Sequence, residues 1–209
     1  WAQFHVNSTI RRYQKKRNSR GMTGCAAARA ILDANGLQNI SVEHISGNLT
    51  DHYDPRANVI RLSDAVYNSD SATAVGIAAH EAGHAIQHAQ GYVPIKIRQA
   101  IIPVTSICSN LSMPLILLGL LFSFPSLAYI GVILFGASTV FQLVTLPVEF
   151  NASARAIRVL DEYHYLEDDE LRAAKKTLSA AALTYVAALA VSLANLLRLF
   201  LLVNRSKRK

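Results

Sequence analysis

Residues 74–89 read AVGIAAHEAGHAIQHA, a stretch that decides the fold because it sets the pattern H-E-x-x-H in an apolar, helix-favouring background. His80 and His84 are four positions apart, so on an α-helix both imidazoles project from one face and can reach the same metal ion. Glu81 then lies beside the open position of that metal, where a bound water needs a general base. We expect a helix over residues 71–89, ended at Gly91, whose two histidines hold zinc.

Two histidines do not complete a catalytic zinc site, which requires a third protein ligand. His88 continues the same helix face. However, eight residues of helix separate it from His80 by about 12 Å, so the three histidines cannot share one ion. We therefore expect His88 to be structural or partly exposed.

The candidates for the third ligand lie downstream of a long apolar segment. Glu149 follows that segment directly, and an ionisable residue at such a boundary needs either solvation or a buried partner. Two carboxylates further on belong to a charged run that is typical of a solvated helix face. The alternatives to Glu149 are Asp161, Glu162 and His164.

The character of the chain changes near residue 100. Residues 101–124 and 127–148 contain no formal charge, and each is long enough to cross a bilayer core of about 30 Å. Only Pro125 and Ser126 separate them, so they should form a hairpin that returns Glu149 to the side of His80 and His84. Residues 178–203 are a third candidate span.

The first hundred residues have the pattern of a small folded domain. Residues 4–20 predict a basic amphipathic helix on the membrane surface. Residues 23–35 predict a helix stopped by Gly36. Residues 42–45 and 58–62 are strand candidates of a small antiparallel sheet, with a turn at 54–58. Strand 58–62 could offer its edge to an extended peptide, and an ordinary structural hairpin is the alternative.

The net charge of +7 would suit a nucleic-acid partner, but its placement favours a lipid bilayer. Basic clusters occupy residues 11–20 and 205–209, and basic residues that flank membrane spans contact anionic headgroups. No nucleic-acid-binding module accompanies the charge. The remaining basic residues near the ends of apolar segments are Lys96, Arg98, Arg155, Arg158, Lys175 and Lys176.

Several segments together resemble the YugP-like bacterial membrane neutral zinc metallopeptidase family. They are RNSRGMTG near the N-terminus, HYDPRANVIRLS, HEAGHAIQH, and LPVEFNAS after the hairpin. The resemblance covers nearly the whole chain. It implies a peptidase with a Glu-type third ligand, which supports Glu149, and a membrane helix upstream of Trp1. It also implies that relatives often carry Asp at the position of Asn151.

The sequence and this resemblance predict a mainly α membrane protein with a small antiparallel β element. A zincin-like helix would pack next to a transmembrane hairpin, followed by a third transmembrane helix. The expected segments are a catalytic domain (1–99), the hairpin (100–148), a soluble helical segment with the third ligand (149–177), a transmembrane helix (178–203) and a basic tail (204–209). The larger number of positive charges lies on the catalytic side, which predicts a cytoplasmic site in a multi-pass bacterial membrane protein.

The expected reaction is zinc-dependent hydrolysis of peptide bonds in a peptide or membrane-protein substrate. Zinc would be held by His80, His84 and Glu149, and Glu81 would be the general base. A zinc-dependent membrane scaffold or regulator without catalysis is the alternative, although the intact Glu81 argues against it. A metal transporter would need ionisable residues inside the spans, and the hairpin offers mainly uncharged polar ones. The candidates for stabilising the oxyanion are His164, Tyr163, Arg155 and Arg158.

Overall fold

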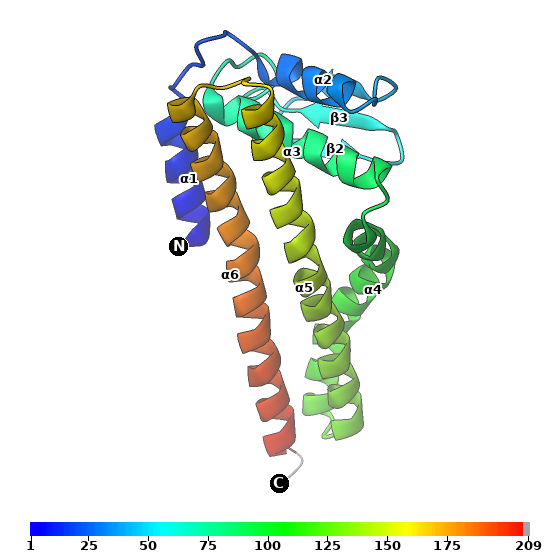
Figure 1. Ribbon diagram of the computed structural model, residues 1–209. Coiled ribbons are helices and arrows are strands. Elements are labelled where there is room, and N and C mark those ends of the chain that lie inside the picture. The colour runs from blue at the N-terminus through cyan, green and yellow to red at the C-terminus, as the bar shows by residue number, and fades with distance from the viewer. Residues whose placement is uncertain (207–209) are drawn as a thin grey trace. The chain divides into compact units, whose positions relative to one another are not determined.

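A computed structural model describes residues 1–206 of the chain (Figure 1). The last three residues of the predicted basic tail, 207–209, lie outside the described part. The chain divides into two compact units. Unit 1 combines Trp1–Tyr92 with Val148–Thr184, and unit 2 combines Val93–Pro147 with the residues from Tyr185 onwards. The two longest helices, α5 (Pro125–Glu162) and α6 (Asp168–Ser206), therefore contribute to both units.

Unit 1 contains a small sheet in the order β1 (Ser41–His44), β3 (Val59–Leu62), β2 (His52–Asp54). The β2–β3 pair is antiparallel, and its turn contains Asn58 at a φ of 57°; β2 was not among the predicted strands. β1 pairs with β3 in parallel, so the sheet is mixed rather than purely antiparallel. After β1 the chain crosses to the far side of the sheet to form β2, and β3 then fills the position between these two strands. β3 is therefore the central strand, and the prediction that it offers an edge was wrong; β2 is an edge.

The helices α2 (Gly24–Ala34) and α3 (Ala72–Ala89) begin and end where the sequence predicts. The Thr23 hydroxyl accepts a hydrogen bond from the Ala26 N–H at the start of α2, and the Ser71 side chain caps α3 in the same way. The chain leaves α3 through Gly91, whose φ of 66° suits glycine. Local capping chemistry therefore sets both helices.

The first helix, α1 (Ala2–Tyr13), is shorter than the predicted basic helix over residues 4–20. α1 ends at Tyr13, and Asn18 further along bonds to loop backbone. Its side-chain amide donates to the carbonyls of Met22 and Asp70, and its backbone N–H also donates to Asp70. These bonds fasten the end of the N-terminal segment beside the start of α3.

The core of unit 1 surrounds α3, which is buried along most of its length. α2 and the sheet contact α3 (Figure 1), and Ile31, Leu32 and Ile60 are fully buried there. Leu160 of α5 and Leu178 of α6 complete the same apolar cluster. A helix that is apolar on nearly all sides requires such cover, and the cover holds its histidines in a fixed position.

Unit 2 consists of α4 (Val93–Leu121), the first part of α5 and the last part of α6. The hairpin turn falls at residues 122–124, and Pro125 begins α5, a position where proline is favoured. The turn thus lies directly before the predicted Pro125–Ser126.

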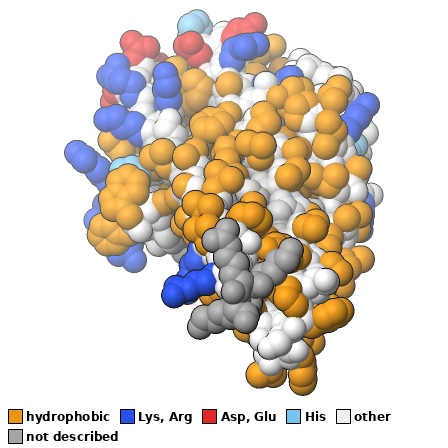
Figure 2. Space-filling model, turned by 90° about the horizontal axis from the view of Figure 1, so that it is seen from below, with side chains coloured by type: hydrophobic (Ala, Val, Ile, Leu, Met, Phe, Trp, Pro, Cys, Tyr) orange, Lys and Arg blue, Asp and Glu red, His pale blue; other side chains and the backbone are white. Residues whose placement is uncertain are grey.

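The described chain contains three helices long and apolar enough to cross a membrane, α4, α5 and α6. Large apolar side chains such as Leu121, Ile133 and Val191 are exposed on them, and apolar side chains cover much of the face seen in Figure 2. A helix surface that is apolar on its outside is suited to lipid rather than water. This confirms the prediction of a mainly α membrane protein.

Candidate metal centre

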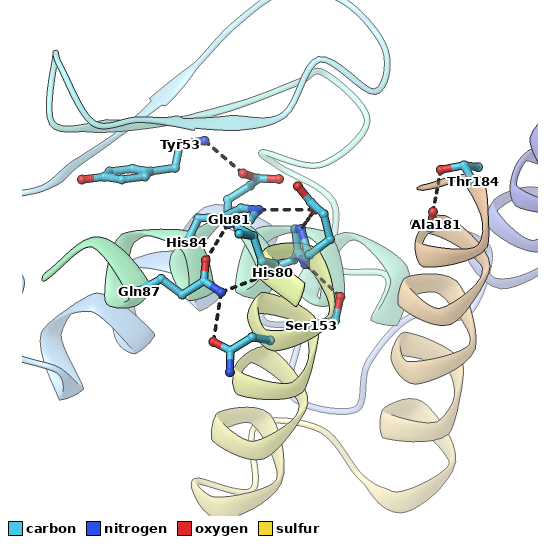
Figure 3. A network of polar contacts seen from close by, with 11 residues as sticks. Tyr53, His80, Glu81, His84, Gln87, Ser153, Ala181 and Thr184 are labelled. Atoms are coloured by element: carbon cyan, nitrogen blue, oxygen red, sulfur yellow. Dashed lines mark hydrogen bonds and ion pairs between the residues drawn. The ribbon is translucent and has the colours of Figure 1, made fainter. Parts of the chain in front are cut away.

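Three side chains of unit 1 converge on one point. His80 and His84 come from α3 (Figure 3), and Glu149 comes from α5. The Nε2 atoms of His80 and His84 lie 3.3 Å and 3.5 Å from the same Glu149 oxygen, Oε2. The two imidazole rings are nearly perpendicular, with centroids 4.6 Å apart. The structure thus brings together three residues that the sequence singled out.

The separations of the two imidazole nitrogens from the Glu149 oxygen also match those between ligands of a zinc ion. Zinc binds imidazole nitrogen and carboxylate oxygen at about 2.1 Å, so tetrahedral ligand atoms are separated by about 3.4 Å. The observed separations of 3.3 Å and 3.5 Å bracket that value. A direct N–H···O hydrogen bond is normally shorter, about 2.7–3.2 Å. The donor set and its spacing therefore fit zinc.

Gln87 fixes which nitrogen of His84 faces this point. The Gln87 Nε2 donates to the backbone carbonyl of Val148 at 2.8 Å and to Asn151 Oδ1 at 3.0 Å, which orients the amide. Its Oε1 must then accept from His84 Nδ1, 3.0 Å away. With the proton on Nδ1, the lone pair of neutral His84 is on Nε2, where a metal binds. Such partners of a ligating histidine set both its tautomer and its orientation.

Ser153 has the corresponding position beside His80. Its hydroxyl lies 3.1 Å from His80 Nδ1 and can accept the ring proton, which leaves Nε2 directed at Glu149. Ser153 is one helical turn after Glu149 on α5, so the same face of this helix supplies a carboxylate and a supporting hydroxyl. Both histidines are therefore oriented through their outer nitrogens.

Asn151 connects this network to Arg155. Its Oδ1 accepts from Gln87 and also from the Arg155 Nε at 2.7 Å. Arg155 in addition donates to the Gln90 side chain at 2.6 Å. The amide oxygen of Asn151 accepts both bonds, as a carboxylate oxygen of Asp would. The hydrogen bonds that link Gln87 to Arg155 are therefore present with Asn at this position.

Glu81 is buried on α3 and is held from the sheet side. Its Oε2 accepts a hydrogen bond of 2.9 Å from the backbone N–H of Tyr53 on β2 (Figure 3). Tyr53 is paired with Ile60 in the register of β2 and β3, and its N–H is directed to the outer side of β2. This carboxylate therefore lies between the histidines and a strand edge.

The centre has an excess of negative charge. Burial alone would lower the pKa of His84, but its hydrogen bond with Glu149 and the charges of Glu81 and Glu149 raise the pKa overall. A divalent cation bound beside the two imidazoles would balance the negative charge of the two carboxylates.

The absence of a side chain at Gly83 explains how α5 comes so close to α3. A Cβ at Gly83 would lie only 2.7 Å from the backbone oxygen of Ala152, so any larger residue forces the helices apart. Ala152 is three residues after Glu149. The glycine within H-E-x-x-H thus permits the approach that delivers the third carboxylate.

The other residues considered from the sequence lie elsewhere. The His88 ring packs edge-on against the Tyr53 ring, with centroids 6.1 Å apart. His164 follows the end of α5, where its φ is 53°, and it is outside the metal group. Sequence reasoning missed Gln87, Ser153 and Tyr53. Gln87, three residues after His84, and Ser153, four after Glu149, had the helical spacing that would have indicated them.

Comparison with known proteins agrees with this geometry. The model of a family described as "Putative neutral zinc metallopeptidase" matches residues 1–204. The chain is 48% identical over 198 residues to "Putative membrane protease YugP" of Bacillus subtilis (strain 168), an alignment that covers 95% of this chain and 88% of the relative. No solved structure matches the chain. The chain thus belongs to the neutral zinc metallopeptidase family.

Proposed function

We propose that this protein is a membrane zinc endopeptidase in which His80, His84 and Glu149 hold the metal and Glu81 is the general base. The observation that carries the proposal is the convergence of two imidazole Nε2 atoms and one carboxylate oxygen at the separations of zinc ligands. The outer partners of both histidines support it, because they direct Nε2 to the same point.

Bound zinc would supply Lewis acidity, lowering the pKa of a coordinated water towards about 7 and polarising the scissile carbonyl. The protein contributes the proton transfers. Glu81 accepts the proton of the attacking water and later returns it to the leaving nitrogen of the cleaved bond. The hydrogen bond from the Tyr53 N–H holds one Glu81 oxygen, which leaves the other for the proton.

The edge of β2 is the proposed place for the substrate. Edge strands bind extended peptides through backbone hydrogen bonds. On the outer side of β2 the Tyr53 N–H is bonded to Glu81, so a peptide there would use the remaining backbone groups of that edge. A peptide paired there would pass beside the general base. This replaces the edge predicted on β3, which is occupied on both sides. A membrane-protein substrate is favoured because the same chain carries three candidate membrane helices.

We also propose that the catalytic unit faces the cytoplasm of a bacterium. The basic residues of α1 and of the start of α6 support this orientation, since cytoplasmic segments carry an excess of Lys and Arg. Labelling of single cysteines in unit 1 with a membrane-impermeant reagent tests it. Labelling in intact cells would contradict the assignment.

The decisive test of the proposed reaction is Glu81→Gln. This change keeps the size and hydrogen-bonding ability of the side chain but removes the base. We expect zinc to remain bound while peptide cleavage falls by about 10²–10⁴-fold. Full cleavage by a zinc-bound Glu81→Gln protein would eliminate the assigned role. A wild-type protein that binds zinc but cleaves no peptide in a broad peptide library would favour a non-catalytic scaffold.

A further inference from the structure

A basic groove lies between α1 and the start of α6, away from the metal centre and wholly within unit 1. It encloses about 740 Å³ and no acidic residue lines it. α1 contributes Arg12, and α6 contributes Arg172, Lys175 and Lys176; we call these four the groove cations. Among the described residues, none of them forms an ion pair with a carboxylate. The groove therefore has positive charge that its own walls do not neutralise.

Two of the groove cations meet at one aromatic ring. The guanidinium carbon of Arg12 is 5.7 Å from the centre of the Tyr13 ring, and the Lys176 Nζ is 5.9 Å from it. The ring thus brings together cations from two different helices. A cation over an aromatic face retains its outward N–H donors, so both groups stay available to an anion in the groove.

Hydroxyl groups accompany the cations. Thr9 of α1 and Ser179 of α6 line the same cavity, as does Ser8, whose own hydroxyl donates to the His5 carbonyl. A phosphate group accepts hydrogen bonds from Arg, Lys and hydroxyl donors at once, and charge-assisted bonds of this kind are the strongest ones available at a surface. The set of donors in the groove therefore matches a phosphate better than a carboxylate or a sugar.

The groove also changes polarity along α6. Lys175, Ser179 and Leu183 occupy successive turns of one helix face and all line the cavity. From Arg172 to Leu183 the lining passes from cationic to apolar over about 16 Å of helix. Leu183 leads into the apolar part of α6, a candidate membrane span. A free inorganic anion makes no use of the apolar end, whereas a phospholipid presents a phosphate joined to acyl chains.

We propose that this groove binds an anionic phospholipid of the bilayer, with its phosphate on the groove cations and an acyl chain directed along α6 past Leu183. Exposed aromatic residues at the start of α1 agree with a position at the membrane interface, since the N-cap residue Trp1 is 85% exposed and Phe4 76% exposed. α1 runs beside the start of α6 (Figure 1), and Lys16 and Asp169 form an ion pair next to the groove. A bound lipid would thus connect the N-terminal helix to α6.

Native mass spectrometry of the full chain in detergent tests the proposal without reference to peptidase activity. The protein is titrated separately with phosphatidylglycerol, with phosphatidylcholine of the same acyl chains, and with inorganic phosphate. We expect one tightly bound phosphatidylglycerol per chain, weaker phosphatidylcholine binding, and no displacement of the lipid by phosphate at equal concentration. Equal binding of both lipids, or displacement by phosphate, would overturn the proposal.

Charge-matched variants locate the site. Arg12→Gln with Lys176→Gln removes two groove cations and should weaken phosphatidylglycerol binding by about tenfold or more. Arg11→Gln with Lys15→Gln removes the same charge from neighbouring positions that do not line the groove, and should leave the affinity nearly unchanged. An equal loss in both pairs would show diffuse attraction only and reject the groove. Should the first pair fail to fold, Ser179→Leu within the groove replaces it, and unchanged binding by that variant would equally reject the site.

Discussion

The metal centre and the α1–α6 groove differ in how their charged side chains are placed. At the metal centre, both carboxylates and His84 are buried and His80 is half-buried, and the outer nitrogens of both histidines are held by Gln87 and Ser153. In the groove, cations on exposed helix faces have no carboxylate partners among the described residues. Buried metal ligands that are fixed in position suit a small cation, which requires an exact coordination geometry. The long, mobile Lys and Arg side chains of the groove suit a larger anion. Removing a group that shapes the metal centre should therefore lower zinc binding, whereas removing an exposed charge outside both regions should have only a small effect.

The largest effect is expected from Gly83→Val. The new side chain would collide with the backbone of Ala152, which cannot move without displacing α5 and Glu149. We expect stoichiometric zinc binding to be lost and cleavage with it, as measured by metal analysis of the purified protein. The matched control is Gly136→Val, because a Cβ there has no neighbour closer than 4.0 Å. Zinc binding by Gly83→Val equal to that of the control would contradict the close helix approach.

Gln87→Leu should have the next largest effect. It keeps the volume of the side chain but removes the acceptor that orients His84 and the donor to Val148 and Asn151. We expect zinc affinity to fall by about 10–100-fold, measured by competition with a chelator. Gln38→Leu, at an exposed position, serves as the control. An unchanged affinity would mean that His84 is oriented by other contacts.

Ser153→Ala should have a smaller effect of the same kind. Only one hydrogen bond, to His80 Nδ1, is lost, and this part-buried site leaves room for water to replace the hydroxyl. We expect a decrease in zinc affinity of about tenfold or less, measured by the same chelator competition. A loss larger than that of Gln87→Leu would mean that Ser153, rather than Gln87, is the more important of the two histidine partners.

The smallest effect concerns the exposed carboxylate of Asp54. Its hydrogen bonds with Arg61 and with the backbone of Ala57 and Arg56 lower its pKa below the ordinary 3.8. The charged form is thus favoured by folding, so its stabilisation is present above the unfolded-state pKa and is lost as the pH falls through the folded-state pKa. Asp54→Asn should lower the melting temperature slightly at pH 7 and not at all below that range. An equal difference at both pH values would contradict this origin.

The sequence indicated the candidate metal ligands and the general base, but not the residues that orient the two histidines. His80, Glu81 and His84 followed from spacing on one helix, and Thr23 and Ser71 marked helix starts by local capping. Glu149 needed two pieces of long-range information, the hairpin and the resemblance to a family. Gln87 and Ser153 had a helical spacing from His84 and Glu149 that could have indicated them, but their contacts across α3 and α5 are not visible in the sequence.

The mixed sheet was missed for a related reason. Antiparallel pairing of β2 with β3 is set by a short turn, which the sequence displays at residues 54–58. Parallel pairing of β1 with β3 depends on the path of the chain between strands and has no local pattern. Local chemistry therefore predicted β1, β3 and most of the helices, whereas β2 and the pairing of distant segments had to be observed.

The most direct measurement of the central claim is the zinc content of Glu149→Ala beside that of His84→Ala and His88→Ala. The three proteins are purified with equal zinc supplied, and folding is checked by circular dichroism. If Glu149 completes the site, Glu149→Ala should lose zinc as His84→Ala does, while His88→Ala keeps one zinc per chain. A Glu149→Ala protein that retains one tightly bound zinc would contradict the assignment of Glu149 as the third ligand.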